Sequence, residues 1–252
     1  MPITDAQQPF HHDGDRVGVL LCHGFTSNPS SLIEWARYVA DAGRTVALPR
    51  LPGHGTSWQE LAVTRWQDWY ECVDAEYGRL AERCDEVFVA GLSMGGALAL
   101  RLAAHHTDVR GLVLVNPALS TVDRTAYLAG VLHRVLPSVK AVGGDILREG
   151  VEENAYDRTP VAAVAQLMRL FVDVKSTLDL VTCPIDLYRS AIDHVVPGSS
   201  SDTVRRLVSS VDLTETVLHD SYHVATMDND RQAIFDGTLA FVDRVLAGQT
   251  TA

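Results

Sequence analysis

The chain has 252 residues, 46% of them hydrophobic, and a mean hydropathy of +0.04, as expected for a globular protein with one sizeable core. Its formal net charge of −11 argues against nucleic acid and anionic membrane surfaces as partners, and no segment approaches the roughly 18 uninterrupted apolar residues of a membrane span. Residues 1–16 lack the basic and apolar regions of a signal peptide, so we expect a cytoplasmic protein with four reduced, scattered cysteines.

Short apolar runs alternate with amphipathic ones along most of the chain. This alternation predicts a mostly parallel sheet covered by helices on both faces. The strands are expected at 16–22, 45–51, 86–90, 109–117, 183–191 and 214–219, and the helices at about 31–42, 66–83, 94–105 and 230–247.

Residues 118–180 interrupt this alternation. They contain at least two helical patterns and no convincing strand, and Thr159–Pro160 is typical of the N-cap and first turn of an apolar helix that continues through Phe171. Long connections between sheet strands are uncommon unless they serve a function. We therefore predict a helical cap at 118–180, inserted after the strand that ends near Pro117, on a core formed by 1–117 and 181–252.

One glycine-rich hinge stands between the predicted strand at 86–90 and the helix that follows. Gly91-Leu92-Ser93-Met94-Gly95 is a G-x-S-x-G sequence in the strand–turn–helix context of a nucleophile elbow. Side chains two residues before and after the serine would collide in so sharp a turn, so glycine is needed at both places. The alternative is an ordinary glycine-rich turn. The context favours Ser93 as a nucleophile.

A nucleophilic serine needs a base and an acid that orients the base. In folds with such an elbow the acid and the histidine follow the serine in chain order, each after a later strand. Asp193 follows the strand at 183–191, and His223 lies in the loop before the last helix. The rivals are Asp186 for the acid, with His194 and His219 for the base.

The second donor to an oxyanion is expected in the loop after the first main strand. The backbone N–H of Phe25 is placed to donate there, beside the N–H of Met94 at the start of the elbow helix. His23 occupies the wrong strand end for a catalytic base. We predict that it fixes the loop through hydrogen bonds.

Five stretches together resemble the α/β-hydrolase superfamily over nearly the whole chain: "LLCHGFTSNP", "LPGHGTS", "VAGLSMGG", "SAIDHVVP" and "SYHVATMD". Within it, "ENAYDRTPVAAVAQLMRL" and "DSYHVATMDND" are similar to the cap and histidine loop of bacterial monoacylglycerol lipases and related carboxylesterases. The resemblance implies that Ser93, Asp193 and His223 form the triad, with the oxyanion hole at Phe25 and Met94. It also implies that Glu153 hydrogen-bonds a glycerol hydroxyl; the alternative for Glu153 is a solvated carboxylate.

The predicted substrate is a neutral lipid ester. No Arg/Lys cluster occurs in the site loops, and residues 118–180 carry eight acids and seven bases, so most of the negative charge lies elsewhere. The apolar cap side chains are candidates for an acyl tunnel and for contact with a lipid surface, or they pack on the core: Tyr127, Leu128, Val131, Leu132, Val135, Leu136, Leu167, Met168, Leu170 and Phe171.

We therefore expect a serine hydrolase that cleaves monoacylglycerol to fatty acid and glycerol through an acyl-enzyme. No metal or organic cofactor is implied. One alternative is a general carboxylesterase or thioesterase with the same triad, and another is a ligand-binding protein that does not turn its ligand over.

Overall fold

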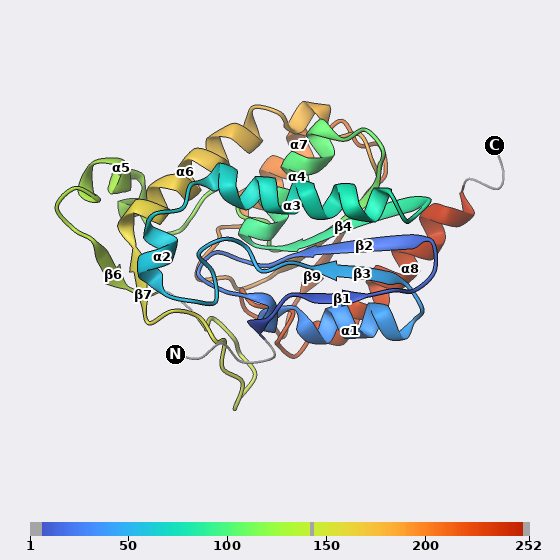
Figure 1. The fold of residues 1–252 in the computed structure, drawn as a ribbon, viewed down its shortest axis with the longest axis horizontal. Helices are drawn as coiled ribbons and strands as arrows, with labels where there is room; N and C mark the ends of the chain where they lie inside the picture. The colour runs from blue at the N-terminus through green and yellow to red at the C-terminus, as the bar shows by residue number, and fades with distance from the viewer. Residues whose placement is uncertain (1–6, 142–143, 249–252) are drawn as a thin grey trace.

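A seven-stranded sheet forms the centre of the protein, in the order β1-β3-β2-β4-β5-β8-β9 (Figure 1). The computed structural model describes residues 7–141 and 144–248. Within this sheet all strand pairs are parallel except the edge pair of β1 and β3. The predicted α/β-hydrolase fold is confirmed. The strands are β1 (Phe10–His12), β2 (Val17–Cys22), β3 (Thr45–Leu48), β4 (Glu86–Leu92), β5 (Val109–Val115), β8 (Ile185–Ser190) and β9 (Leu213–Leu218).

Helices cover both faces of the sheet. On one face lie α3 (Trp66–Ala81), α4 (Met94–His105) and α7 (Ser199–Leu207), and on the other lie α1 (Ile33–Asp41) and α8 (Arg231–Ala247) (Figure 1). The central strand β4 therefore buries successive side chains in two different cores: Val89 faces α4, while Phe88 meets Phe241 of α8. Burial on both faces explains the continuous apolar runs of the sequence.

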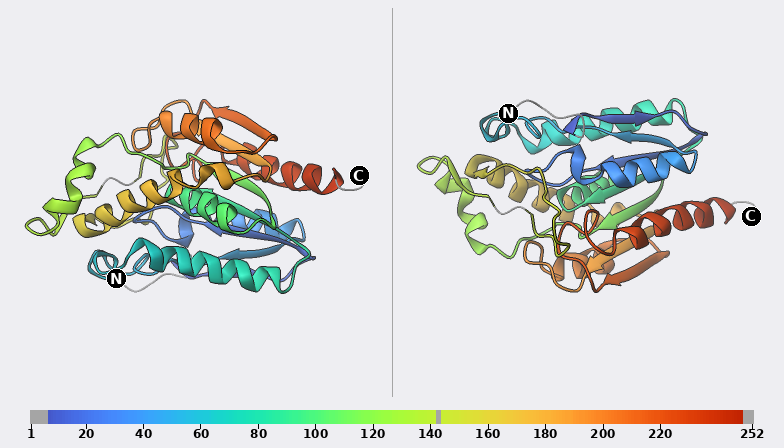
Figure 2. Two further views of the ribbon diagram at one scale, coloured as in Figure 1. Left: turned by 90° about the horizontal axis from the view of Figure 1, so that it is seen from above. Right: turned by 90° about the horizontal axis from the view of Figure 1, so that it is seen from below.

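Residues 118–180 connect β5 to β8 and lie beyond the carboxyl edge of the sheet. Figure 2 shows the first elements of this segment at one end of the molecule, opposite the carboxyl end of α8, while its long helix runs back over the helical layer. The long helix α6 (Val161–Lys175) packs against α3 and α4, so this segment is joined to the helical layer as well as to the sheet edge. Its elements are η3 (Arg124–Leu128), α5 (Ala129–Leu132), β6 (Ser138–Lys140), β7 (Arg158–Pro160), α6 (Val161–Lys175) and η4 (Leu178–Leu180).

Two details predicted for this segment are wrong. It contains a small antiparallel ladder, in which Val139 of β6 pairs with Thr159 of β7. Because Thr159 belongs to that ladder, it does not cap the helix: Pro160 is the N-cap residue, with extended backbone (φ −70°, ψ 125°), and α6 begins at Val161. Three other short elements had no counterpart in the prediction: β1, η2 (Pro29–Ser31) and α2 (Trp58–Ala62).

The segment is fastened to a turn of the core. The hydroxyl of Tyr156 donates to the carbonyl of Gly53 at 2.6 Å and accepts from the N–H of Thr56 at 2.9 Å. Nearby, the Asn28 side-chain amide donates to the carbonyl of Asn154 at 2.6 Å. The "LPGHGTS" turn, which carries no catalytic group, therefore serves as a docking point for residues 154–156.

Candidate active site

Ser93 occupies the turn between β4 and α4, with φ 57° and ψ −119°. A positive φ is costly for a residue with a side chain and is typical of functional turns. The neighbouring glycines leave no room for a Cβ. A Cβ on Gly91 would lie 2.4 Å from the carbonyl carbon of Gly95, and one on Gly95 would lie 1.9 Å from the carbonyl oxygen of Cys22. The turn therefore brings backbone segments so close together that only glycine fits at positions 91 and 95, as the sequence suggested.

The structure brings Ser93, His223 and Asp193 into one chain of hydrogen bonds. His223 Nε2 lies 2.9 Å from Ser93 Oγ, and His223 Nδ1 lies 2.7 Å from Asp193 Oδ2. With the serine hydroxyl donating to Nε2, Nδ1 carries the proton and donates to the carboxylate. All three side chains are buried almost completely. This is the geometry that nucleophilic catalysis by serine requires.

The second carboxylate oxygen of Asp193 is also engaged. Oδ1 accepts from the backbone N–H groups of Val195 and Val196, both at 2.8 Å. The turn itself therefore fixes the carboxylate, leaving Oδ2 for His223. An acid held in this way keeps its partner imidazole in one orientation.

The rival residues lie in other environments. Asp186 is buried within β8, where its two oxygens accept from the hydroxyls of Tyr188 and Thr214, and burial raises its pKa. His219 is exposed just after β9. His194 lines the site, but its Nδ1 pairs with Asp145 at 2.8 Å.

Two polar residues that were not expected from the sequence fix the backbone at His223 through hydrogen bonds. The buried side-chain amide of Asn116 donates to the carbonyl of His223 at 2.8 Å and to Ser190 Oγ at 2.9 Å. Ser190 Oγ in turn donates to the carbonyl of Tyr222 at 2.7 Å. Asn116 has φ 44°, and an asparagine before a proline at the end of a buried strand was the available signal for such a special position.

The two residues predicted to supply oxyanion donors, Phe25 and Met94, lie beside Ser93. Met94 is the first residue of α4, so its N–H has no acceptor within the helix. Phe25 lines the same cavity as Ser93, and a Cβ on the preceding Gly24 would lie only 3.5 Å from Ser93 Cβ. The loop after β2 therefore runs in contact with the serine.

His23 supports that loop from inside the protein. The N–H of Leu51 donates to His23 Nε2 at 3.1 Å, and His23 Nδ1 donates to the carbonyl of Gly24 at 3.0 Å. Burial lowers the pKa of His23 to about 4, so the ring is neutral at pH 7. Its contacts are those of the predicted structural residue.

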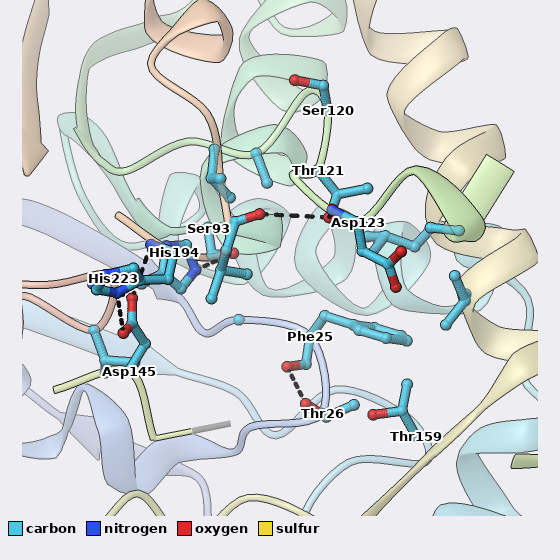
Figure 3. Close-up of a pocket in the computed structure, with 18 of the residues that line it drawn as sticks. Phe25, Thr26, Ser93, Ser120, Thr121, Asp123, Asp145, Thr159, His194 and His223 are labelled. Atoms are coloured by element: carbon cyan, nitrogen blue, oxygen red, sulfur yellow. Dashed lines mark hydrogen bonds and ion pairs between the residues drawn. The ribbon is translucent and has the colours of Figure 1, made fainter. Parts of the chain in front are cut away.

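A cavity of about 170 Å³ opens above Ser93, between the sheet edge and residues 118–180. Figure 3 shows His223, His194 and Asp145 gathered on one side of it. Four side chains of α6 form an apolar wall: Val164, Leu167, Met168 and Phe171. Glu153 also lines the cavity, half-buried, and its carboxylate accepts from the N–H of Gly144 at 3.1 Å.

Neither a metal cluster nor a spanning helix is found in the described parts of the chain. Residues 7–141 and 144–248 hold no group of three or more His, Cys, Asp or Glu side chains placed to bind a metal ion. Within the same ranges, none of the helices is long and apolar enough to cross a bilayer.

Residues 15–230 match the protein family described as serine aminopeptidase, S33. The chain belongs to this serine hydrolase family. It is 42% identical to the thermostable monoacylglycerol lipase of Bacillus sp. (strain H-257), in an alignment that covers 95% of this chain and 96% of the relative. It is also 26% identical to a carboxylesterase of Bacillus subtilis (strain 168), over 94% of this chain and 97% of that protein.

A solved structure is similar over nearly its full length. It comes from a study of two metagenome-derived lipolytic enzymes, LipS and LipT, and matches with a TM-score of 0.93 and 37% identity. The match covers 96% of this chain and 99% of the other. The family, the fold and the hydrogen-bonded serine site therefore all indicate a serine hydrolase.

Proposed function

We propose that this serine hydrolase cleaves carboxylic esters of neutral lipids, and monoacylglycerols in particular, to a fatty acid and glycerol. The observation that carries the proposal is the chain from Ser93 Oγ through His223 to Asp193, placed at the floor of a cavity with an apolar wall. The identity of 42% with a monoacylglycerol lipase over nearly both full lengths supports the choice of ester.

The proposed reaction uses the polar groups around Ser93. His223 accepts the proton of Ser93 as Oγ attacks the ester carbonyl, and Asp193 stabilises the imidazolium. The N–H groups of Phe25 and Met94 bind the developing oxyanion. His223 then protonates the leaving alcohol, and water repeats the sequence on the acyl-enzyme.

The two ends of the substrate find different surroundings in the cavity. The acyl chain lies along the apolar wall of α6, where each buried CH₂ contributes about 0.8 kcal/mol. The alcohol lies toward Glu153, whose carboxylate accepts a hydrogen bond from a free glycerol hydroxyl. Such a charge-assisted bond is worth about 1.5–3 kcal/mol, so Glu153 favours glycerol over a simple alkyl alcohol.

Hydrolysis rates across a set of esters test this assignment. We expect monoacylglycerol to be cleaved about 10 to 100 times faster than an alkyl ester of equal chain length, with di- and triacylglycerols as poor substrates. Glu153→Ala should remove the preference while leaving a p-nitrophenyl ester unaffected. Equal rates on mono- and triacylglycerol would refute the monoacylglycerol assignment and leave a general carboxylesterase.

Residues 118–180 act as a cap in this proposal, and their apolar side chains include two sets. The four side chains of α6 named above line the cavity, whereas five side chains of η3, α5 and the turn that follows are exposed: Tyr127, Leu128, Val131, Val135 and Leu136. Leu170 and Leu132 belong to neither set, because they pack against buried side chains. The exposed set suits transient contact with a lipid surface. Replacing Leu128 and Val131 by serine should weaken binding to phosphatidylcholine vesicles, with hydrolysis of a water-soluble ester unchanged.

A further inference from the structure

The loop that carries His223, residues 219–230, is held by a segment of the cap as well as by the core. This segment, residues 144–148, lies between β6 and β7 in the chain, yet its contacts are with loops near the carboxyl edge of the sheet. Two carboxylates join the segment 144–148 to the histidine loop, one contributed by the segment and one by the loop.

Asp145 is the carboxylate on the cap side. Its Oδ2 accepts from the backbone N–H of His223 at 3.2 Å and from that of His194 at 3.1 Å. Its Oδ1 pairs with His194 Nδ1 at 2.8 Å, and its backbone carbonyl accepts from the N–H of Val224 at 3.1 Å. One largely buried side chain thus connects the loop of the acid to the loop of the base (Figure 3).

Asp228 is the carboxylate contributed by the histidine loop, and it is completely buried. It accepts from the N–H groups of Leu147 and Arg148 in the cap segment, at 2.7 and 2.8 Å. It also accepts from the N–H of Tyr222 at 2.9 Å. The cap segment and the residue before His223 therefore share one buried acceptor.

These contacts complete the support of His223. Its carbonyl accepts a hydrogen bond from Asn116, and its N–H donates one to Asp145. The N–H and the carbonyl of His223 belong to the two peptide planes on either side of its Cα. Hydrogen bonds to both groups therefore fix the direction in which the imidazole leaves the backbone. The hydrogen bond to the N–H of His223 therefore comes from the cap.

We propose that Asp145 is a positioning residue that couples the seated cap to the catalytic histidine. The cap thereby sets the alignment of the imidazole with Ser93 and Asp193, in addition to covering the substrate. The inference rests on the proposed function of the site and adds a role that lies outside the triad and the oxyanion hole.

The test compares three variants by ester hydrolysis and by proton NMR. Asp145→Ala removes the acceptor for both N–H groups. Asp145→Asn keeps an acceptor oxygen for them and a polar side chain of the same size beside His194. Asp173→Ala is the matched control, because Asp173 of α6 also joins the cap to the core, through Arg101 of α4 at 2.7 Å, away from the histidine loop.

We expect Asp145→Ala to lower kcat on the order of 10- to 100-fold with KM within about threefold, because a small misplacement of a catalytic group is costly. Asp145→Asn should recover kcat to within about threefold of wild type, and Asp173→Ala should leave it unchanged. The far-downfield proton between His223 Nδ1 and Asp193 should shift or broaden in Asp145→Ala alone. Asp145→Ser carries the same expectation if the alanine variant does not fold.

A kcat of Asp145→Ala within about threefold of wild type, with the downfield resonance unmoved, would overturn the proposal. So would an equal loss of kcat in Asp173→Ala, since any cap contact would then have the same effect. The resonance needs no substrate, so it tests Asp145 separately from the reaction. A wild-type protein that hydrolyses no ester would refute the proposed function instead.

Discussion

At the scale of single residues, we propose that Asp193 acts through His223. Its Oδ1 is occupied by two backbone N–H groups and its Oδ2 by the imidazole. Asp193→Asn keeps the shape but presents an amide to His223 Nδ1, which favours the wrong tautomer. We expect kcat to fall about 10⁴-fold with little change in KM. Steady-state kinetics on a p-nitrophenyl ester measures both constants.

Asp186→Asn provides the control for this substitution. Asp186 bonds to Tyr188 and Thr214 within the sheet, so its loss should affect stability more than turnover. If Asp186→Asn were inactive and Asp193→Asn retained near-normal activity, the acid would have been assigned to the wrong strand end.

At the scale of elements, the elbow depends on close backbone contact between β4, α4 and the end of β2. A Cβ at position 95 would overlap the carbonyl oxygen of Cys22, at 1.9 Å. Gly95→Ala should therefore destabilise the protein by several kcal/mol, in the range of severe overpacking. Urea unfolding monitored by circular dichroism gives the value.

Gly78→Ala is the matched control, because Gly78 is exposed on α3 and an added Cβ there would meet no atom within 4 Å beyond its neighbours and the backbone of its own helix. Alanine is the better helix former, so this variant should gain about 0.5–1 kcal/mol. A Gly95→Ala protein as stable as Gly78→Ala would contradict the described packing of the elbow.

The sequence patterns that located these elements are local. A buried strand and the helix after it differ in apolar periodicity, so β4 and α4 could be placed, and the order of the strands then led to Asp193 and His223. The ladder of β6 and β7 has only three residues in each strand, too few for a periodicity. Thr159 consequently looked like a helix cap.

Contacts between distant residues leave no such pattern. Asp228 and Leu147 are 81 positions apart, and Asn116 and His223 are 107 apart. A carboxylate or amide in these loops has the composition of any solvent-exposed turn, and only the folded chain shows it to be buried and shared. Asn116 and Asp228 could therefore not be found from a sequence pattern, whereas the strand order led to Asp193 and His223 as candidates.

At the scale of the whole molecule, two buried neutral histidines link stability to pH. Burial lowers the pKa of His23 to about 4 and that of His54 well below its ordinary value. The pKa of histidine in an unfolded chain is about 6.5. Between about pH 6.5 and 4 the unfolded chain binds a proton that folded His23 does not bind, so stability falls as the pH falls.

We expect the free energy of unfolding to decrease between pH 7 and pH 5, with His23 contributing about 2 kcal/mol and His54 adding in the same direction. Urea unfolding at the two pH values, at constant ionic strength, measures the difference. Equal stability at both values, or greater stability at pH 5, would show that these rings are protonated in the folded protein.

The central claim is that Ser93 is the nucleophile of the whole assembly. The most direct measurement is labelling of the intact protein with a fluorophosphonate, followed by mass spectrometry of its peptides. We predict one modified serine, Ser93, with labelling abolished in Ser93→Ala and ester hydrolysis lost to the same extent as labelling. A label on any other serine, or hydrolysis that persists in a fully labelled protein, would contradict the claim.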